Sequence, residues 1–82
     1  MIAMALQVLL AATLRRFVPD YDPLTGLEVT VPSAMTVKDL VERLGLPTEE
    51  IKLIMVNGVA SSWETVLHGD ERVAFFPPVG GG

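Results

Sequence analysis

Alternating hydrophobic and polar positions predict β-strands in the first third of the chain. Between Leu6 and Leu14, apolar residues occupy both faces, which is typical of a central strand covered well on one side and partly on the other. A loop rich in Pro, Asp and Gly follows at residues 19–26. Residues 27–31 then alternate strictly and stop at Pro32, which predicts a half-buried second strand.

The second half of the chain predicts two more strands and a hairpin. Residues 51–56 form an apolar run that ends at Asn57-Gly58, a strong signal for a type I′ turn. A short strand or an irregular return is expected at residues 59–61. Residues 72–76 predict the last strand, which Pro77-Pro78 ends because proline cannot donate a backbone hydrogen bond.

Between these strands, residues 62–70 predict less regular structure. Residues 62–67 are expected to form a turn or a short helical stretch that buries Trp63 or Leu67. His68-Gly69-Asp70 then indicates a turn into the last strand.

One helix is predicted at residues 37–44. Thr36 is a favourable N-cap, and Asp39 can complete a capping box with it. Gly45 can adopt the left-handed conformation that ends a helix. The apolar positions form one stripe of Val37, Leu40, Val41 and Leu44.

The order strand, strand, helix, strand, short strand, strand predicts an α+β fold. Two hairpin-like halves flank one helix that packs across a mixed sheet of four to five strands, which is the β-grasp plan. We expect a β-grasp domain over residues 1–76 and a flexible C-terminal tail over residues 77–82.

The length and composition of the chain indicate one small domain. The chain has 82 residues, of which 50% are hydrophobic, and it contains no cysteine, so disulfides are excluded. The uncharged run from Met1 to Leu14 is too short to span a bilayer, and its basic residues follow it rather than precede it as in a secretory signal. We therefore expect a soluble cytoplasmic protein.

Charge and side-chain chemistry indicate no catalytic or metal site within the domain. Six basic against ten acidic residues give a net charge of −4, which argues against nucleic-acid binding. Arg15-Arg16 is expected to be a solvated strand end, and His68 a solvated turn residue without an oriented partner. Glu49-Glu50 and Asp70-Glu71 are expected to be solvated loop charges.

The end of the sequence carries the most distinctive chemistry. From Phe76 to Gly82 there is no charged side chain, and Pro77-Pro78 stiffens the exit from the last strand. Alternation turns Phe76 away from the core and places it beside Leu9 and Ala11 if the first and last strands are neighbours. An exposed apolar patch at the root of a tail is a docking surface. The competing interpretation is an inert, frayed glycine terminus.

Glycine suits a tail whose carboxylate enters the active site of another protein, because a backbone without Cβ passes a narrow channel. The carboxylate of Gly82 is a poor electrophile and needs activation, for example as an acyl-adenylate, before a nucleophile replaces an oxygen.

The sequence resembles the MoaD/ThiS sulfur-carrier group of ubiquitin-like proteins, and within it the small subunit of molybdopterin synthase. The segment that carries this resemblance is Phe75-Phe76-Pro77-Pro78-Val79-Gly80-Gly81-Gly82, where the family usually has Phe-Phe-Pro-Pro-Val-Ala-Gly-Gly. Weaker similarity lies at Val56-Asn57-Gly58, at residues 67–74 and in the helix segment 36–46. The chain differs from the family in two places. The residues before Leu6 resemble a short extension, and the loop 19–26 does not follow the family pattern.

The resemblance implies that Gly81-Gly82 is the functional pair. An E1-like adenylating enzyme of the MoeB/ThiF type would use ATP to adenylate the Gly82 carboxylate, and a persulfide sulfur would convert it to a thiocarboxylate. The chain itself would bind no cofactor. In the MoaD branch the sulfur builds the dithiolene of molybdopterin in a complex with the large synthase subunit of the MoaE type. The residues expected to contact partners are Phe76, Pro77, Pro78, Val79, Gly80, Leu9, Ala11, Arg15 and Arg72.

Three other functions are compatible with the sequence. The sulfur could pass to another acceptor, such as the thiamin thiazole. The chain could be a protein modifier joined through Gly82 to lysines of its targets. It could also be an interaction domain with an inert tail.

Overall fold

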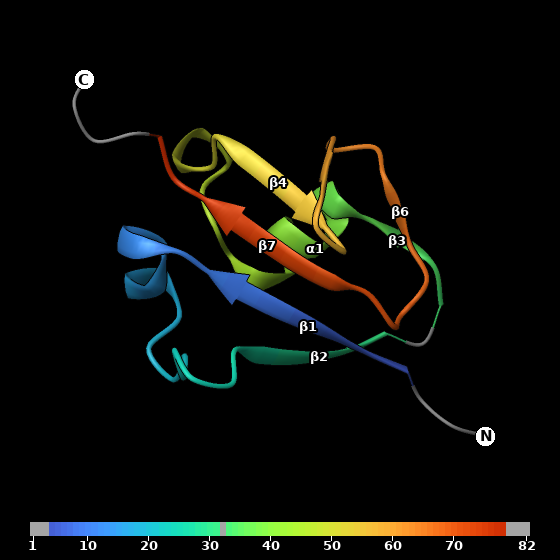
Figure 1. Cartoon of the computed structure of the whole chain (residues 1–82), viewed down its shortest axis with the longest axis horizontal. Coiled ribbons are helices and arrows are strands. Elements are labelled where there is room, and N and C mark those ends of the chain that lie inside the picture. Colours follow the sequence, from blue (N-terminus) through green and yellow to red (C-terminus); the bar gives the residue numbers. More distant parts are fainter. Residues whose placement is uncertain (1–3, 32, 79–82) are drawn as a thin grey trace.

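The computed structural model describes residues 4–31 and 33–78, and its centre is a five-stranded mixed sheet. The strand order is β2-β1-β7-β4-β5, with β1 and β7 parallel in the middle and the other neighbours antiparallel (Figure 1). The strands are β1 (Met4–Leu10), β2 (Leu27–Val31), β4 (Leu53–Val56), β5 (Val59–Ser61) and β7 (Arg72–Phe76). The predicted β-grasp architecture is confirmed.

Helix α1 (Val37–Leu44) covers one face of this sheet (Figure 1). Its boundaries are those that the sequence predicts. Thr36 Oγ1 accepts the backbone N–H of Asp39 at 3.1 Å, and an Asp39 carboxylate oxygen accepts the N–H of Thr36 at 3.3 Å, which completes the capping box. Gly45 ends the helix at φ 74°.

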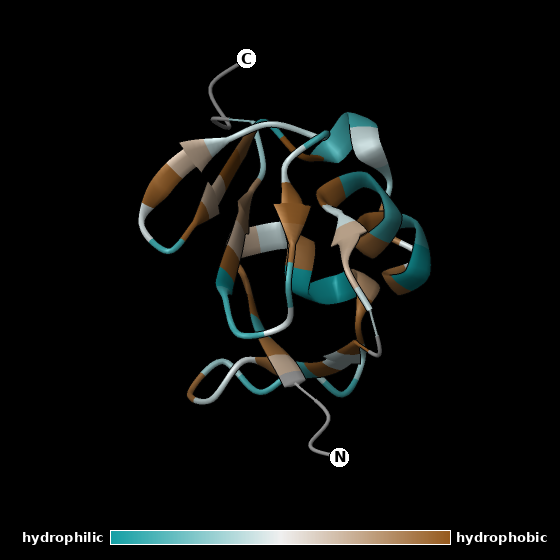
Figure 2. Ribbon diagram, turned by 90° about the vertical axis from the view of Figure 1, so that its right-hand side faces the viewer, coloured by the Kyte–Doolittle hydropathy of each residue, from teal (hydrophilic) through white to brown (hydrophobic). Residues whose placement is uncertain are grey.

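The core lies between α1 and the facing side of the sheet. The apolar residues of α1 share the face toward the sheet, and the charged residues on its other face are exposed to solvent (Figure 2). The buried hydrophobic side chains of the sheet are Leu6, Val8, Leu10, Val29, Val31, Ile54, Val73 and Phe75, and those of the helix are Val37, Leu40 and Val41.

Three strands, β2, β5 and β7, lie where the sequence places them. β2 and β7 have the predicted boundaries, although Pro32, expected to end β2, lies outside the described residues. β4 begins at Leu53, two residues later than predicted. The hairpin to β5 turns at Asn57 and Gly58, which have φ values of 51° and 81° as a type I′ turn requires.

The first strand is shorter at its C-terminal end than the sequence predicts. β1 begins at Met4 and ends at Leu10, because Ala12 adopts φ 50° and turns the chain into the 3₁₀ helix η1 (Ala12–Phe17). Leu14, predicted as a strand residue, reaches the core from η1 instead. The same turn places Arg15-Arg16 on η1, exposed to solvent, rather than at a strand end.

The segment 62–67 forms a turn and a short strand rather than a helical stretch. β6 (Val66–Leu67) pairs with β3 (Met35–Thr36) in a small second sheet that the sequence pattern does not predict. Leu67 is buried and Trp63 is half-buried. A further 3₁₀ turn, η2 (Thr48–Glu50), precedes β4. In the described part of the chain, no helix is both long and apolar enough to cross a membrane.

Candidate functional site

The end of β7 presents one aromatic ring to the core and the next to solvent. Val73 and Phe75 are completely buried, whereas Ala74 is half-buried and Phe76 keeps 37% of its surface exposed. This is the facing that alternation predicts, because successive strand residues point to opposite sides of a sheet.

The sheet register gathers further apolar side chains around Phe76 on the face away from α1. Phe76 lies opposite Leu53 of β4, while Ala74 lies between Leu9 of β1 and Met55 of β4. Leu53 is 43% exposed. We call this surface the outer patch, made of Leu9, Ala11, Leu53, Met55, Ala74 and Phe76.

The loop after η1 closes one side of the outer patch. The Tyr21 hydroxyl accepts the backbone N–H of Leu10 at 2.9 Å, and Arg15 Nε donates to the Leu10 carbonyl at 3.1 Å. These two bonds satisfy backbone groups at the end of β1 and hold η1 and the loop after it against the sheet. A hollow of about 250 Å³ remains beside Phe76, lined by Leu9, Leu10, Ala11, Arg15, Tyr21, Pro23, Ala74, Phe75 and Phe76.

Arg15 and Arg72, both predicted to contact a partner, lie at different ends of the sheet. Arg15 lines the hollow beside Phe76. Arg72 begins β7, four residues from Phe76, which is about 13 Å at strand spacing. Its Nε donates to Gln7 Oε1 at 3.3 Å, and Gln7 Nε2 in turn donates to the Thr25 carbonyl at 2.9 Å. The structure therefore brings Arg15 together with Phe76, Leu9 and Ala11, but not Arg72.

The tail is described only at its root. Pro77 is half-buried and Pro78 is exposed. The predicted site residues Val79, Gly80, Gly81 and Gly82 lie outside the described residues.

The prediction that Glu71 is a solvated loop charge is wrong. It is only 8% exposed, and its carboxylate accepts the backbone N–H groups of His68, Gly69 and Asp70 at 2.9–3.2 Å. Burial raises the pKa of Glu71, but these backbone hydrogen bonds outweigh it and hold the pKa below its usual value. Glu71 therefore orders the turn into β7, which is a structural role.

The other polar candidates remain on the surface. His68, Glu49 and Asp70 are exposed, while Glu50 is half-buried and approaches Arg16 at 4.0 Å. Within residues 4–31 and 33–78, His, Asp and Glu side chains nowhere gather in a group of three that could hold a metal ion.

Sequence reasoning missed the contributions of Leu53, Met55 and Tyr21 to the outer patch and its hollow. The alternation of residues 51–56 contains a signal for Leu53 and Met55, since both flank the buried Ile54. No sequence signal places Tyr21, because its contact with Leu10 depends on how an irregular loop returns to the sheet.

Comparison with known proteins gives one family and several structures of the same fold. A family model described as Mut7-C ubiquitin matches residues 3–80. No curated protein sequence matches the chain. The solution structure of the HVO 2177 protein of Haloferax volcanii is similar, with a TM-score of 0.72 and 26% identity over 98% of this chain and 88% of that one.

Two other similar structures show the fold at lower identity. Small archaeal modifier protein 1 of H. volcanii has a TM-score of 0.71 and 21% identity over 93% of this chain and 99% of that one. A Pyrococcus furiosus protein, provisionally described as molybdopterin converting factor, subunit 1, has a TM-score of 0.69 and 22% identity over 93% and 99%. The expected ubiquitin-like relationship is confirmed, and because the family model spans nearly the whole sequence, the chain belongs to the Mut7-C ubiquitin family.

Proposed function

We propose that this chain is a ubiquitin-like sulfur carrier whose C-terminal carboxylate, on Gly82, is adenylated and converted to a thiocarboxylate. The observation that carries the proposal is the outer patch, an exposed apolar surface centred on Phe76, at the point where the chain leaves the sheet toward Gly81-Gly82. A carrier needs a docking surface beside its reactive end and no catalytic groups of its own.

The length of the tail supports docking at this place. Four residues follow Pro78, and an extended chain covers at most about 3.6 Å per residue, so Gly82 can reach about 14 Å from Pro78. An enzyme that acts on the Gly82 carboxylate must therefore approach the end of β7 closely. The outer patch and the hollow beside Arg15 are the surfaces it meets there.

The chemistry is supplied by the partners. An E1-like enzyme would direct the Gly82 carboxylate to the α-phosphate of ATP, which releases pyrophosphate and leaves an acyl-adenylate. A persulfide sulfur would then attack the acyl carbon and displace AMP, and a thiol would cleave the resulting disulfide to release the thiocarboxylate. We place these ATP-dependent steps in the cytoplasm.

For the sulfur acceptor we propose the pterin precursor of the molybdenum or tungsten cofactor, in a complex with a large synthase subunit. The Phe75-Phe76-Pro77-Pro78 segment and the fold shared with the P. furiosus protein support this choice over the thiamin thiazole.

A second candidate function is protein modification. The fold shared with small archaeal modifier protein 1 favours it, since a modifier uses the same activated glycine but passes it to a lysine. Chain-specific conjugates on denaturing gels of cell extract, absent when Gly82 is deleted, would support modification over sulfur transfer.

The docking step is tested by ATP–pyrophosphate exchange with the E1-like enzyme. We expect Phe76→Ala to lower the apparent affinity of the enzyme for the chain about tenfold or more, as loss of a buried aromatic anchor does at an interface. Val66→Ala is the matched control, because Val66 is also exposed, at 48%, but lies on β6. Equal exchange with Phe76→Ala and Val66→Ala would contradict the proposal.

A further inference from the structure

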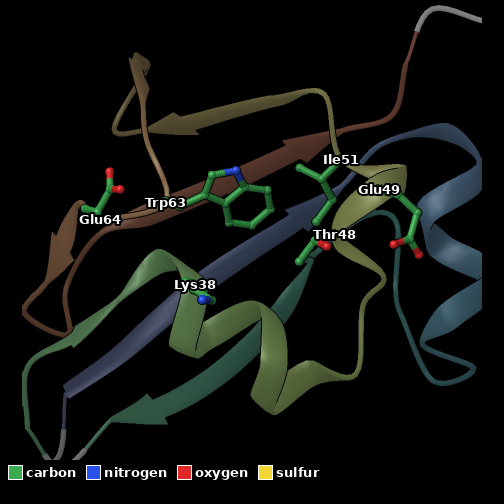
Figure 3. Close-up of a pocket in the computed structure, with 6 residues that line it drawn as sticks. All are labelled: Lys38, Thr48, Glu49, Ile51, Trp63 and Glu64. Atoms are coloured by element: carbon green, nitrogen blue, oxygen red, sulfur yellow. The ribbon is translucent and has the colours of Figure 1, made fainter.

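A second surface groove lies on the helix side of the molecule, away from the outer patch. It has a volume of about 460 Å³ and is lined by Lys38, Thr48, Glu49, Ile51, Trp63 and Glu64. Figure 3 shows Trp63 in the middle of the groove, Glu64 toward one end, Glu49 toward the other, and Lys38 on α1. Helix α1 covers the sheet face opposite the outer patch, and the groove shares no lining residue with the hollow beside Phe76.

Backbone hydrogen bonds hold the walls of the groove in place. The carbonyls of Trp63 and Thr65 accept the N–H groups of Lys38 and Val37, each at 3.0 Å. The turn is closed further by Ser62, whose N–H donates to Thr65 Oγ1 at 3.1 Å. The half-buried Trp63 ring is thus carried on a turn that is fixed to the start of α1.

The same bonds make the groove unsuitable for an anion. The first N–H groups of a helix attract anions when they are free. Here Val37 and Lys38 donate to the turn carbonyls, and Asp39 donates to Thr36 Oγ1. The helix start therefore offers no free amide among these first three residues.

The side chains of the groove carry an excess of negative charge. Glu49, Glu64 and Lys38 are exposed, and no side-chain hydrogen bond or ion pair to another described residue engages any of them. Two carboxylates against one ammonium favour a cationic ligand. The half-buried indole ring of Trp63 adds to this preference, since the face of a tryptophan ring attracts a cation.

We propose that the Trp63 groove binds an arginine-containing peptide segment of a partner protein. The planar guanidinium of one arginine stacks on the indole of Trp63 on the side of Glu64, as arginine does more readily than lysine at stacked sites. Glu49, toward the other end of the groove, attracts a second basic residue of the same segment. Ile51, which is only 8% exposed, supplies an apolar floor for the arginine methylenes. This site is independent of tail activation and of the proposed sulfur transfer.

Trp63 provides a direct probe, because it is the only tryptophan in the chain. The full-length protein is titrated with a capped Arg-Gly-Arg peptide up to about 10 mM, the range needed for a weak surface site, while Trp63 fluorescence is recorded. The matched ligand is the same peptide with citrulline in place of arginine, which keeps the shape and removes the charge. We expect saturable quenching or enhancement with the arginine peptide and at least threefold weaker binding of the citrulline peptide.

Two charge variants test the sign of the interaction. Glu64→Gln is expected to weaken binding about two- to fivefold, and Lys38→Gln to strengthen it by a similar factor, as surface charge contacts of this kind do. Both side chains are exposed, so both variants should fold. The opposite signs, equal binding of the citrulline peptide, or no change in Trp63 fluorescence with the arginine peptide would each overturn the proposal.

Discussion

At the scale of single residues, the two neighbouring phenylalanines of β7 have different roles, one in stability and the other in the proposed recognition of a partner. Phe75 is completely buried in the core between the sheet and α1, whereas Phe76 stands in the outer patch with 37% of its surface exposed. One strand thus anchors the fold with one ring and offers the next ring to a partner.

This division predicts unequal effects on unfolding. Phe75→Ala should lower the free energy of unfolding by about 3–5 kcal/mol, because it leaves a cavity in a packed core. Phe76→Ala should lower it by about 1 kcal/mol or less, since the ring is partly solvated already. Urea denaturation of both variants measures the difference, and similar losses would mean that Phe76 supports the fold rather than a docking surface.

Glu71 is the second residue whose environment predicts a measurable effect. Its carboxylate accepts three backbone N–H groups in the turn before β7, and such charge-assisted bonds contribute about 1.5–3 kcal/mol. Glu71→Gln should therefore lower the free energy of unfolding by about 2 kcal/mol at neutral pH. Asp70→Asn is the matched control at an exposed neighbour, with an expected change within about 0.5 kcal/mol.

The pH dependence of the same variant has a definite sign. The folded state lowers the pKa of Glu71, so the unfolded chain takes up a proton first as the pH falls. The stabilisation by Glu71 is complete above the unfolded pKa of about 4.3 and is lost as the pH falls through the lower folded pKa. The difference in unfolding free energy between wild type and Glu71→Gln should shrink over that range; a constant difference down to low pH would contradict this role.

At the scale of elements, two glycines with similar backbone angles have different surroundings. Gly26 and Gly45 have φ values of 79° and 74°. A Cβ at Gly45 meets nothing within 4 Å, whereas a Cβ at Gly26 would come within 2.8 Å of the Val8 carbonyl oxygen and of Leu9 Cδ2. Gly26 thus lets the loop 19–26 return closely onto β1.

Alanine at these two positions should therefore separate backbone strain from close packing. Gly45→Ala should cost about 1–2 kcal/mol, the penalty of a left-handed conformation for an L-residue. Gly26→Ala should cost clearly more, because the strand carbonyl cannot move aside. Thermal or urea unfolding compares the two, and an equal cost would show that the loop is free to shift away from β1.

The elements that the sequence predicts well are those with local signals. Helix α1 has its N-cap, its apolar stripe and its terminal glycine within ten residues, and β2 and β7 alternate between clear breakers. The turn at Ala12 has no such signal, since alanine rarely adopts φ 50°. It depends on contacts between η1, Tyr21 and the end of β1, which only the tertiary structure brings together.

The same distinction applies to the candidate site. Alternation correctly predicts that Phe76 faces outward, and the parallel pairing of β1 with β7 places it near Leu9 and Ala11. The distance of Arg72 from Phe76 and the burial of Glu71 could not be predicted from alternation. The first depends on strand register and the second on the path of a turn, and the sequence indicates neither.

At the scale of the whole molecule, the chain offers two separate surfaces. The outer patch lies beside the root of the tail, and the Trp63 groove lies on the helix side. Because the two surfaces share no lining residue, Lys38→Gln and Glu64→Gln should leave the rate of ATP–pyrophosphate exchange unchanged, while Phe76→Ala lowers it. Loss of exchange in the groove variants would mean that the activating enzyme contacts both surfaces.

The proposed reaction replaces one atom at the end of the chain. The most direct measurement is the intact mass of the protein after incubation with ATP, the E1-like enzyme and a sulfur donor, with a variant lacking Gly81 and Gly82 as the control. The sulfur-carrier account predicts a mass increase equal to the replacement of one oxygen by one sulfur in the full chain and none in the control. An unchanged mass under conditions that convert a known carrier would contradict it.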